Sequence, residues 1–350
     1  MPPLLADSIP VDVEGAQPTL LTPEPADHEA KFSPDGRHFV DCYSRADLPT
    51  VAVLRLASTG RVLLRLESAD LAPLLETGWT LPQPFVTTAP DGSTPLYSLL
   101  WAPHGLTDNN KQLEPGSVPV LENIYTGPHS AHVPKRFSAV ACTQTAAAAA
   151  LGFAVVFIDG RGTGLRSRAF REQSHKNLGD GAGGPDHPHV IRAMAKTHSY
   201  MDLDNIGIWG HSAGGYDSTH AILSHPKFYK AAVSSAGCHD NRMDKAVWNE
   251  QWMGWPVKPG DHYEAQSNYT IAHQLEGKLL IAHGDLDDNV PLPASIKLVD
   301  ALINADKDFD FLVMPGRNHG FGNEPYFVRR RWDYFVTHLM HKLPPPRSEV

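Results

Sequence analysis

A serine flanked by glycines, in the segment GHSAGG at residues 210–215, is the first candidate for chemistry in this chain. The apolar run NIGIWG leads into it, and a helix-like run follows it. Between a strand and a helix, the pattern G-x-S-x-G presents the serine at a sharp turn, because the glycines relieve crowding there. The alternative is a glycine-rich loop without chemistry, which the flanking patterns disfavour. We therefore predict that Ser212 is a nucleophile.

A serine hydroxyl needs a base, and the base needs an acceptor that fixes its tautomer. Asp285, Asp287 and Asp288 follow the apolar run KLLIAHG, and His319 follows the run DFDFLVMPG. Both groups come directly after predicted strands, where catalytic side chains gather in open α/β sheets. The chain order Ser, Asp, His is the order of α/β-hydrolases. From the residues alone, any of the three aspartates fits.

Two donors are needed to stabilise the oxyanion of an acyl-transfer reaction. The backbone N–H of Ala213, the residue after the candidate nucleophile, is the expected first donor. The segment NIYTGPHS ends a predicted strand, so the Tyr125 hydroxyl or a nearby backbone amide is the candidate second donor. A buried structural role is the alternative for Tyr125.

Strands of continuous apolar character alternate with helices from Val118 onward, which predicts an α/β fold with a mostly parallel sheet covered on both faces. The predicted helix at 294–305 places Ile296, Val299, Leu302 and Ile303 on one face.

The residues before Val118 show a different pattern, in which strand-like runs are separated by tight turns. Turn signals at Pro34-Asp35-Gly36, Thr59-Gly60 and Pro90-Asp91-Gly92 predict antiparallel hairpins. We expect a β-hairpin appendage at 1–78 and an α/β domain at 79–350.

Composition excludes several function classes. The net charge of −9 comes without a basic block beyond RRR at 329–331, which lies in a helical pattern, so neither nucleic acid nor a membrane is an expected partner. Three cysteines without CxxC spacing and 19 histidines without a ligand pattern, HPH at 187–189 included, predict no metal and no cofactor. The N-terminus lacks the pattern of a signal peptide, which leaves the location unknown and the cytoplasm as the default.

Six blocks in order carry a family resemblance: NIYTGPHSAHVPKRF, VVFIDGRGTG, DNIGIWGHSAGGY, AAVSSAG, HGDLDDNVPL and NHGFGNEPYFVRRRWDYFVTHL, over about residues 80–342. Together the blocks resemble the catalytic domain of the prolyl oligopeptidase family (S9), in its dipeptidyl peptidase IV branch. The resemblance implies an α/β-hydrolase fold with Ser212 as nucleophile, His319 as general base and then acid, and Asp287 as its orienter. It also implies that Tyr125 and the Ala213 N–H form the oxyanion hole.

The chain departs from the family in front of the α/β domain. Family members carry a β-propeller there, which restricts access and supplies paired glutamates for the free amino end of a peptide. The hairpins at 31–67 amount to about one blade, and a propeller needs at least four. The resemblance therefore implies that most of a propeller is missing and that the appendage resembles a blade remnant.

The substrate pocket implied by the resemblance also departs from the family. Trp248 and Trp252 stand where the family has aromatic residues, and Asn289 and Val290 match its pocket edge. Core packing is the alternative for Trp252 and for Trp255. Ala213 and Asp244 replace pocket tyrosines, which weakens the expectation of proline selectivity.

The sequence therefore predicts a serine hydrolase that works through an acyl-enzyme, acting as a peptidase on short peptides. The first alternative is a carboxylesterase that uses the same triad on small esters in an open site. The second is a noncatalytic module that binds partners. A homo-oligomer is left open.

Overall fold

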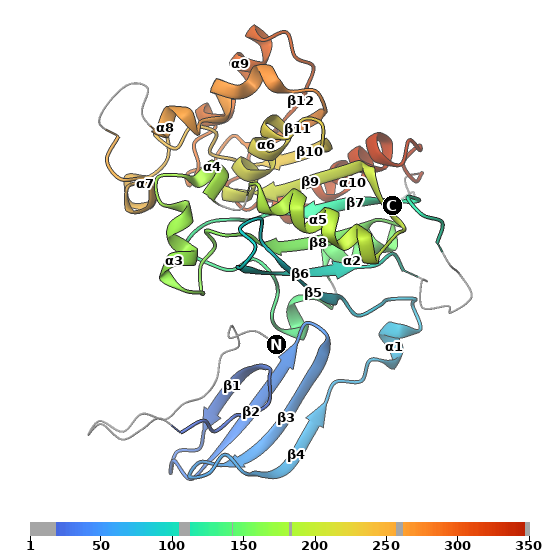
Figure 1. Ribbon diagram of the computed structural model, residues 1–350, viewed down its shortest axis with the longest axis vertical. Coiled ribbons are helices and arrows are strands. Elements are labelled where there is room, and N and C mark those ends of the chain that lie inside the picture. The colour runs from blue at the N-terminus through green and yellow to red at the C-terminus, as the bar shows by residue number, and fades with distance from the viewer. Residues whose placement is uncertain (1–18, 105–112, 142, 182–183, 257–261, 347–350) are drawn as a thin grey trace. The chain divides into compact units, whose positions relative to one another are not determined.

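The computed structural model describes residues 19–104, 113–141, 143–181, 184–256 and 262–346 (Figure 1). The prediction that the N-terminus holds no signal peptide concerns residues 1–18, which lie outside this description, as does Cys142. Contacts divide the chain into two compact units. Unit 1 comprises residues 1–84, 101–111 and 134–151, and unit 2 comprises residues 85–100, 112–133 and 152–350.

Unit 1 is built on a four-stranded antiparallel sheet with its strands in chain order. The strands are β1 (Asp27–Phe32), β2 (His38–Arg45), β3 (Leu48–Leu56) and β4 (Val62–Ser68). The hairpins predicted around Gly36 and Gly60 are confirmed, and both glycines have a positive φ. At Gly60 a Cβ atom would lie 2.2 Å from the Leu21 carbonyl oxygen, so the turn requires glycine. The short helices α1 (Ala72–Leu75), η1 (Phe137–Ala139) and α2 (Gln144–Ala150) complete the unit.

A charged cluster fills part of the interior of unit 1. Arg55 is buried, and its guanidinium donates to Asp41 at 2.8 Å and to Glu24 at 2.6 Å. His28 Nδ1 lies 2.9 Å from the same Asp41 carboxylate. These groups satisfy one another, as buried charges must.

The eight-stranded sheet belongs mainly to unit 2 and has the order β12-β11-β10-β9-β7-β8-β6-β5. Every pairing from β8 through β7, β9, β10 and β11 to β12 is parallel. The strands are β5 (Gln83–Thr88), β6 (Pro95–Trp101), β7 (Val118–Asn123), β8 (Ala154–Asp159), β9 (Met201–His211), β10 (Tyr229–Ser235), β11 (Lys278–Gly284) and β12 (Asp310–Met314). The predicted mostly parallel sheet is confirmed.

Helices cover both faces of this sheet. Side chains alternate along a strand, so β9 presents Ile206 and Ile208 to one face and Trp209 to the other. The two isoleucines share a core with residues of α5 (Asp186–Thr197) and α6 (Ala213–Ser224), whereas Trp209 packs on α10 (Pro325–Leu339). The remaining helices are α3 (Arg168–Arg171), η2 (Glu172–Ser174), α4 (Leu178–Gly181), α7 (Ala246–Met253), α8 (His262–Ala265), η3 (Asn268–Gln274), α9 (Pro293–Asn304) and η4 (Phe321–Asn323).

The helix predicted at 294–305 is present as α9. Leu298 and Leu302 are buried, whereas Ile296 is 45% exposed and Ile303 is 62% exposed. The apolar face noted in the sequence, which includes both isoleucines, is therefore only partly buried. The helix packs against η3, which turns the leucine stripe inward.

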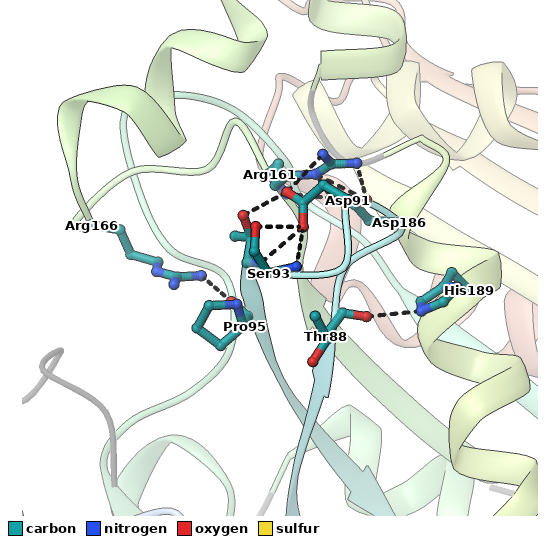
Figure 2. Close-up of polar contacts among 9 residues, drawn as sticks. Thr88, Asp91, Ser93, Pro95, Arg161, Arg166, Asp186 and His189 are labelled. Atoms are coloured by element: carbon teal, nitrogen blue, oxygen red, sulfur yellow. Dashed lines mark hydrogen bonds and ion pairs between the residues drawn. The ribbon is translucent and has the colours of Figure 1, made fainter.

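The predicted hairpin turn between β5 and β6 is confirmed and is tied to neighbouring elements (Figure 2). Asp91 accepts hydrogen bonds from the N–H groups of Ser93 and Thr94 at 2.9 and 2.8 Å. Arg161, which follows β8, donates to Asp91 at 3.2 Å and to the buried Asp186 of α5 at 2.8 Å. The Thr94 hydroxyl also donates to Asp91, at 2.6 Å, and together with these N–H groups it holds the pKa of the Asp91 carboxyl well below its usual range.

Among the helices of the described ranges, none combines 18 or more residues with the hydropathy that a bilayer span requires.

Candidate active site

Ser212 lies between β9 and α6, in a strained backbone conformation. Its φ of 59° and ψ of −121° are rare for a residue with a side chain. Hydrogen bonds on both sides hold it there, because its N–H donates to the Ser235 carbonyl at 2.8 Å and its carbonyl accepts from Gly215 at 2.9 Å. Such strain is retained where the surrounding structure over-determines it, which is common at reactive side chains.

Two glycines make this turn sterically possible. A Cβ atom at Gly210 would lie 2.2 Å from the Gly214 carbonyl oxygen, and one at Gly214 would lie 2.2 Å from the Ile124 carbonyl oxygen. Both contacts are with backbone, which cannot move aside as a flexible side chain could. The flanking glycines of the motif are therefore required by packing.

His319 and Asp287 come together from two adjacent strands. Asp287 follows β11 and His319 follows β12, so parallel pairing brings them to one sheet edge. His319 Nδ1 lies 2.7 Å from Asp287 Oδ2, and because a carboxylate only accepts, the ring nitrogen donates. The Asp287 side chain is buried, and its Oδ1 accepts the backbone N–H groups of Asn289 and Val290 at 3.0 and 2.8 Å. This arrangement fixes the carboxylate and leaves the opposite nitrogen of His319 to act as a base.

The other two aspartates of this loop have different surroundings. Asp285 is exposed and accepts the N–H of Gly316 at 2.6 Å, which ties the loops after β11 and β12 together. Asp288 is also exposed. Of the three candidates, Asp287 is the one that contacts the histidine.

Tyr125 follows β7 and lies beside Ser212. Burial and the nearby Asp217 charge raise the pKa of its hydroxyl, and a hydrogen bond with the Ser212 side chain opposes that rise. A raised pKa keeps the hydroxyl protonated and able to donate. Ala213 is the first residue of α6, so its N–H has no acceptor within the helix. Two donors thus flank the candidate nucleophile.

A cavity of about 140 Å³ opens beside Ser212. The predicted pocket residues Trp248, Asn289 and Val290 line it. Trp252 is not among the residues that line the cavity. Its ring lies 6.3 Å from that of Trp248, and it packs against a small core cluster. The other lining residues are Tyr125, Thr126, Gly127, Pro128, Leu178, Ala213, Tyr216, Asp217, Cys238, Asn241, Asp244 and Lys245.

His211, which sequence reasoning did not select, packs against His319 with ring centroids 4.9 Å apart. Its Nδ1 lies 3.0 Å from the Ser235 hydroxyl, and burial together with the neighbouring His319 lowers its pKa to about 4. His211 is therefore neutral at physiological pH and forms an uncharged wall behind the His319 ring. In the sequence, the position of His211 directly before Ser212 is the signal that could have identified it.

Asp217 of α6 is a second residue that sequence reasoning did not select. It is buried and accepts the N–H of Thr126 at 2.8 Å, which fixes the backbone next to Tyr125. Burial raises the pKa of Asp217 to about 7, which its hydrogen bond from Thr126 and the nearby His187 only partly oppose. An acid in mid-helix has no sequence signature, because only the fold shows what it faces.

The sequence of this chain matches the model of a known protein family. The model of the prolyl oligopeptidase family matches residues 139–342, more than half of the chain. The chain belongs to the prolyl oligopeptidase family. Unit 2 accordingly holds the α/β-hydrolase fold of this family, with the small antiparallel sheet of unit 1 before it in sequence.

Several prolyl oligopeptidase family members are similar over much of this chain. Dipeptidyl peptidase 8 of Homo sapiens is 27% identical over 343 residues, which cover 95% of this chain and 36% of that protein. Probable dipeptidyl-aminopeptidase B of Arthroderma gypseum is 34% identical over 205 residues, which cover 58% and 22% respectively. The crystal structure of Porphyromonas gingivalis dipeptidyl peptidase 4 superposes with a TM-score of 0.81 at 27% identity, over 96% of this chain and 47% of that one. The chain thus spans less than half the length of each of these relatives.

Proposed function

We propose that this chain is a serine peptidase that cleaves short peptides through an acyl-enzyme formed on Ser212. The observation that carries the proposal is the 2.7 Å contact between His319 Nδ1 and the buried Asp287, at the same sheet edge as the strained Ser212. Family membership supports hydrolase chemistry, and the relatives described above are named as peptidases.

In the proposed reaction, His319 Nε2 removes the proton as Ser212 Oγ attacks the scissile carbonyl carbon. Asp287 stabilises the imidazolium that forms and keeps Nδ1 protonated. The imidazolium then gives its proton to the leaving amine, and the acyl group stays on Ser212. A water molecule, activated by the same nitrogen, releases the acid product and restores the serine.

The oxyanion of each tetrahedral intermediate lies between the Tyr125 hydroxyl and the Ala213 N–H. Donors that are already in place stabilise charge that appears only in the transition state, which is why they accelerate the reaction. Asp217 holds the chain after Tyr125 through the Thr126 N–H, so it positions this donor indirectly.

The test is a comparison of amide and ester substrates on the purified chain. We expect turnover of dipeptidyl 4-nitroanilides as well as of short 4-nitrophenyl esters. Ser212→Ala should lower both rates by about 10⁶-fold, because the nucleophile is removed. Ester turnover without anilide turnover would assign the chain as a carboxylesterase instead.

A further inference from the structure

The cavity beside Ser212 has a polar lining that the proposed reaction does not use. Its volume of about 140 Å³ is close to that of an engineered protein cavity that holds benzene, so it accommodates a side chain of about five or six heavy atoms. Ala213, Trp248 and Val290 supply apolar wall, whereas Asn241, Asp244 and Lys245 supply polar wall. The lining therefore suits a substrate side chain that has both an apolar and a polar part.

The position of the cavity places it on the acyl side of the scissile bond. His319 must lie next to the leaving amine, because it donates the proton to that group. The residues that line the cavity include both proposed oxyanion donors and Ser212, whereas His319 is not among them. The cavity therefore receives the side chain of the residue whose carbonyl is attacked.

Asn241 supplies an unsatisfied polar group. Only 5% of the residue is exposed, and its Nδ2 has no hydrogen-bond partner among the described residues. A buried polar group left in this state costs about 1–3 kcal/mol, which a substrate group that bonds to it would recover. A proline or another apolar side chain would fill the space and leave the amide unpaired.

Lys245 and Asp244 line the cavity as an ion pair. Lys245 Nζ donates to Asp244 at 2.8 Å, to the Asn289 backbone carbonyl at 2.7 Å and to the Asn289 side-chain oxygen. An ammonium group has three donors, so all three are used within the protein. The pair thus neither attracts a substrate carboxylate nor leaves Asp244 unpaired for a substrate cation. The other carboxyl group of the lining, Asp217, accepts the Thr126 N–H at 2.8 Å, and burial raises its pKa.

We propose that this cavity selects a neutral carboxamide side chain, glutamine or asparagine, at the residue whose carbonyl Ser212 attacks. A carboxamide both donates and accepts, so it satisfies Asn241 in either orientation of the amide. Its methylene groups contact Trp248 and Val290. This inference rests on the proposed peptidase function and names its substrate class.

The experiment measures kcat/KM for dipeptidyl 4-nitroanilides that differ only in the residue before the anilide. Glutamine and methionine are similar in size, so their ratio isolates the carboxamide. We expect glutamine to be favoured by about 5–150-fold, which corresponds to 1–3 kcal/mol. A parent enzyme that prefers methionine, proline, lysine or glutamate would overturn the inference.

Asn241→Leu should abolish the preference for glutamine over methionine. Asn249 offers a matched control, because it is also buried with an unpartnered amide among the described residues but does not line the cavity. Asn249→Leu should leave the glutamine to methionine ratio unchanged. An equal loss of the ratio in both variants would contradict a role for Asn241.

Hydrolysis of 4-nitrophenyl acetate separates this inference from the proposed function. The acetyl group does not reach into the cavity, so its turnover reports only the chemistry of Ser212. Acetate turnover with no preference for glutamine would overturn the carboxamide inference alone. Absence of acetate turnover would overturn both proposals.

Discussion

At the residue scale, the site depends on a few contacts around Ser212. The serine, the histidine and the loop of three aspartates could be located from sequence, because each directly follows an apolar strand pattern. His211, Asp217 and Asn241 could not, since their importance comes from what they face. That information arises from packing between elements distant in sequence.

Tyr125→Phe tests the proposed oxyanion donor. The substitution removes one hydroxyl and keeps the ring, which lies 5.5 Å from that of His129. We expect kcat to fall by about 100-fold, as for removal of one such donor elsewhere, with the melting temperature nearly unchanged. An unaltered kcat would assign the second donor to a backbone amide instead.

Asp287→Asn tests the proposed orienter. An asparagine in this place offers the wrong hydrogen-bonding pattern to His319 Nδ1, so kcat should fall by about 10⁴-fold. Asp285→Asn is the matched control, because that carboxylate is exposed and accepts the Gly316 N–H rather than contacting His319. Similar losses in the two variants would show that the loop, rather than the Asp287 carboxylate, matters.

At the element scale, the strands were predictable and the orientation of some helices was not. Continuous apolar runs identify β7, β8 and β11 as buried strands, and turn residues identify the hairpins. Helix α9 carries apolar residues on more than one stripe, so periodicity does not reveal which stripe is buried. Packing against the neighbouring η3 determines which stripe is buried, and the residues of η3 show no strong apolar periodicity.

Helix α6 carries a titratable group whose effect on stability can be measured. The folded state raises the pKa of Asp217 from 3.8 to about 7 through burial, so the native protein binds its proton more tightly than the unfolded chain. The stabilising effect of that proton is complete below about pH 4 and is lost as the pH rises through about 7. Asp217→Asn keeps an acceptor for Thr126 and removes this dependence.

We therefore expect the melting temperature of Asp217→Asn, relative to the parent, to rise between pH 5 and pH 8. Each pKa unit corresponds to about 1.4 kcal/mol, so a shift of several degrees is expected. Thermal unfolding at a series of pH values is the measurement. A constant difference, or one that falls with pH, would contradict the burial argument.

At the scale of the whole molecule, the chain joins a hydrolase domain to one small sheet. Within the described residues, unit 1 holds a single four-stranded antiparallel sheet, the strand number of one propeller blade. The family model matches residues 139–342, most of which belong to unit 2. Unit 2 supplies every residue of the candidate site.

The most direct test of that chemistry is covalent labelling with a fluorophosphonate, followed by mass spectrometry of the proteolysed protein. A fluorophosphonate reacts with a serine only when a neighbouring base activates it. We predict one label, on the peptide that contains Ser212. The label should be lost in Ser212→Ala and retained in the control variant Ser117→Ala, because Ser117 is an exposed serine outside the site. An unlabelled parent protein, or a label on another residue, would contradict the assignment of Ser212 as the nucleophile.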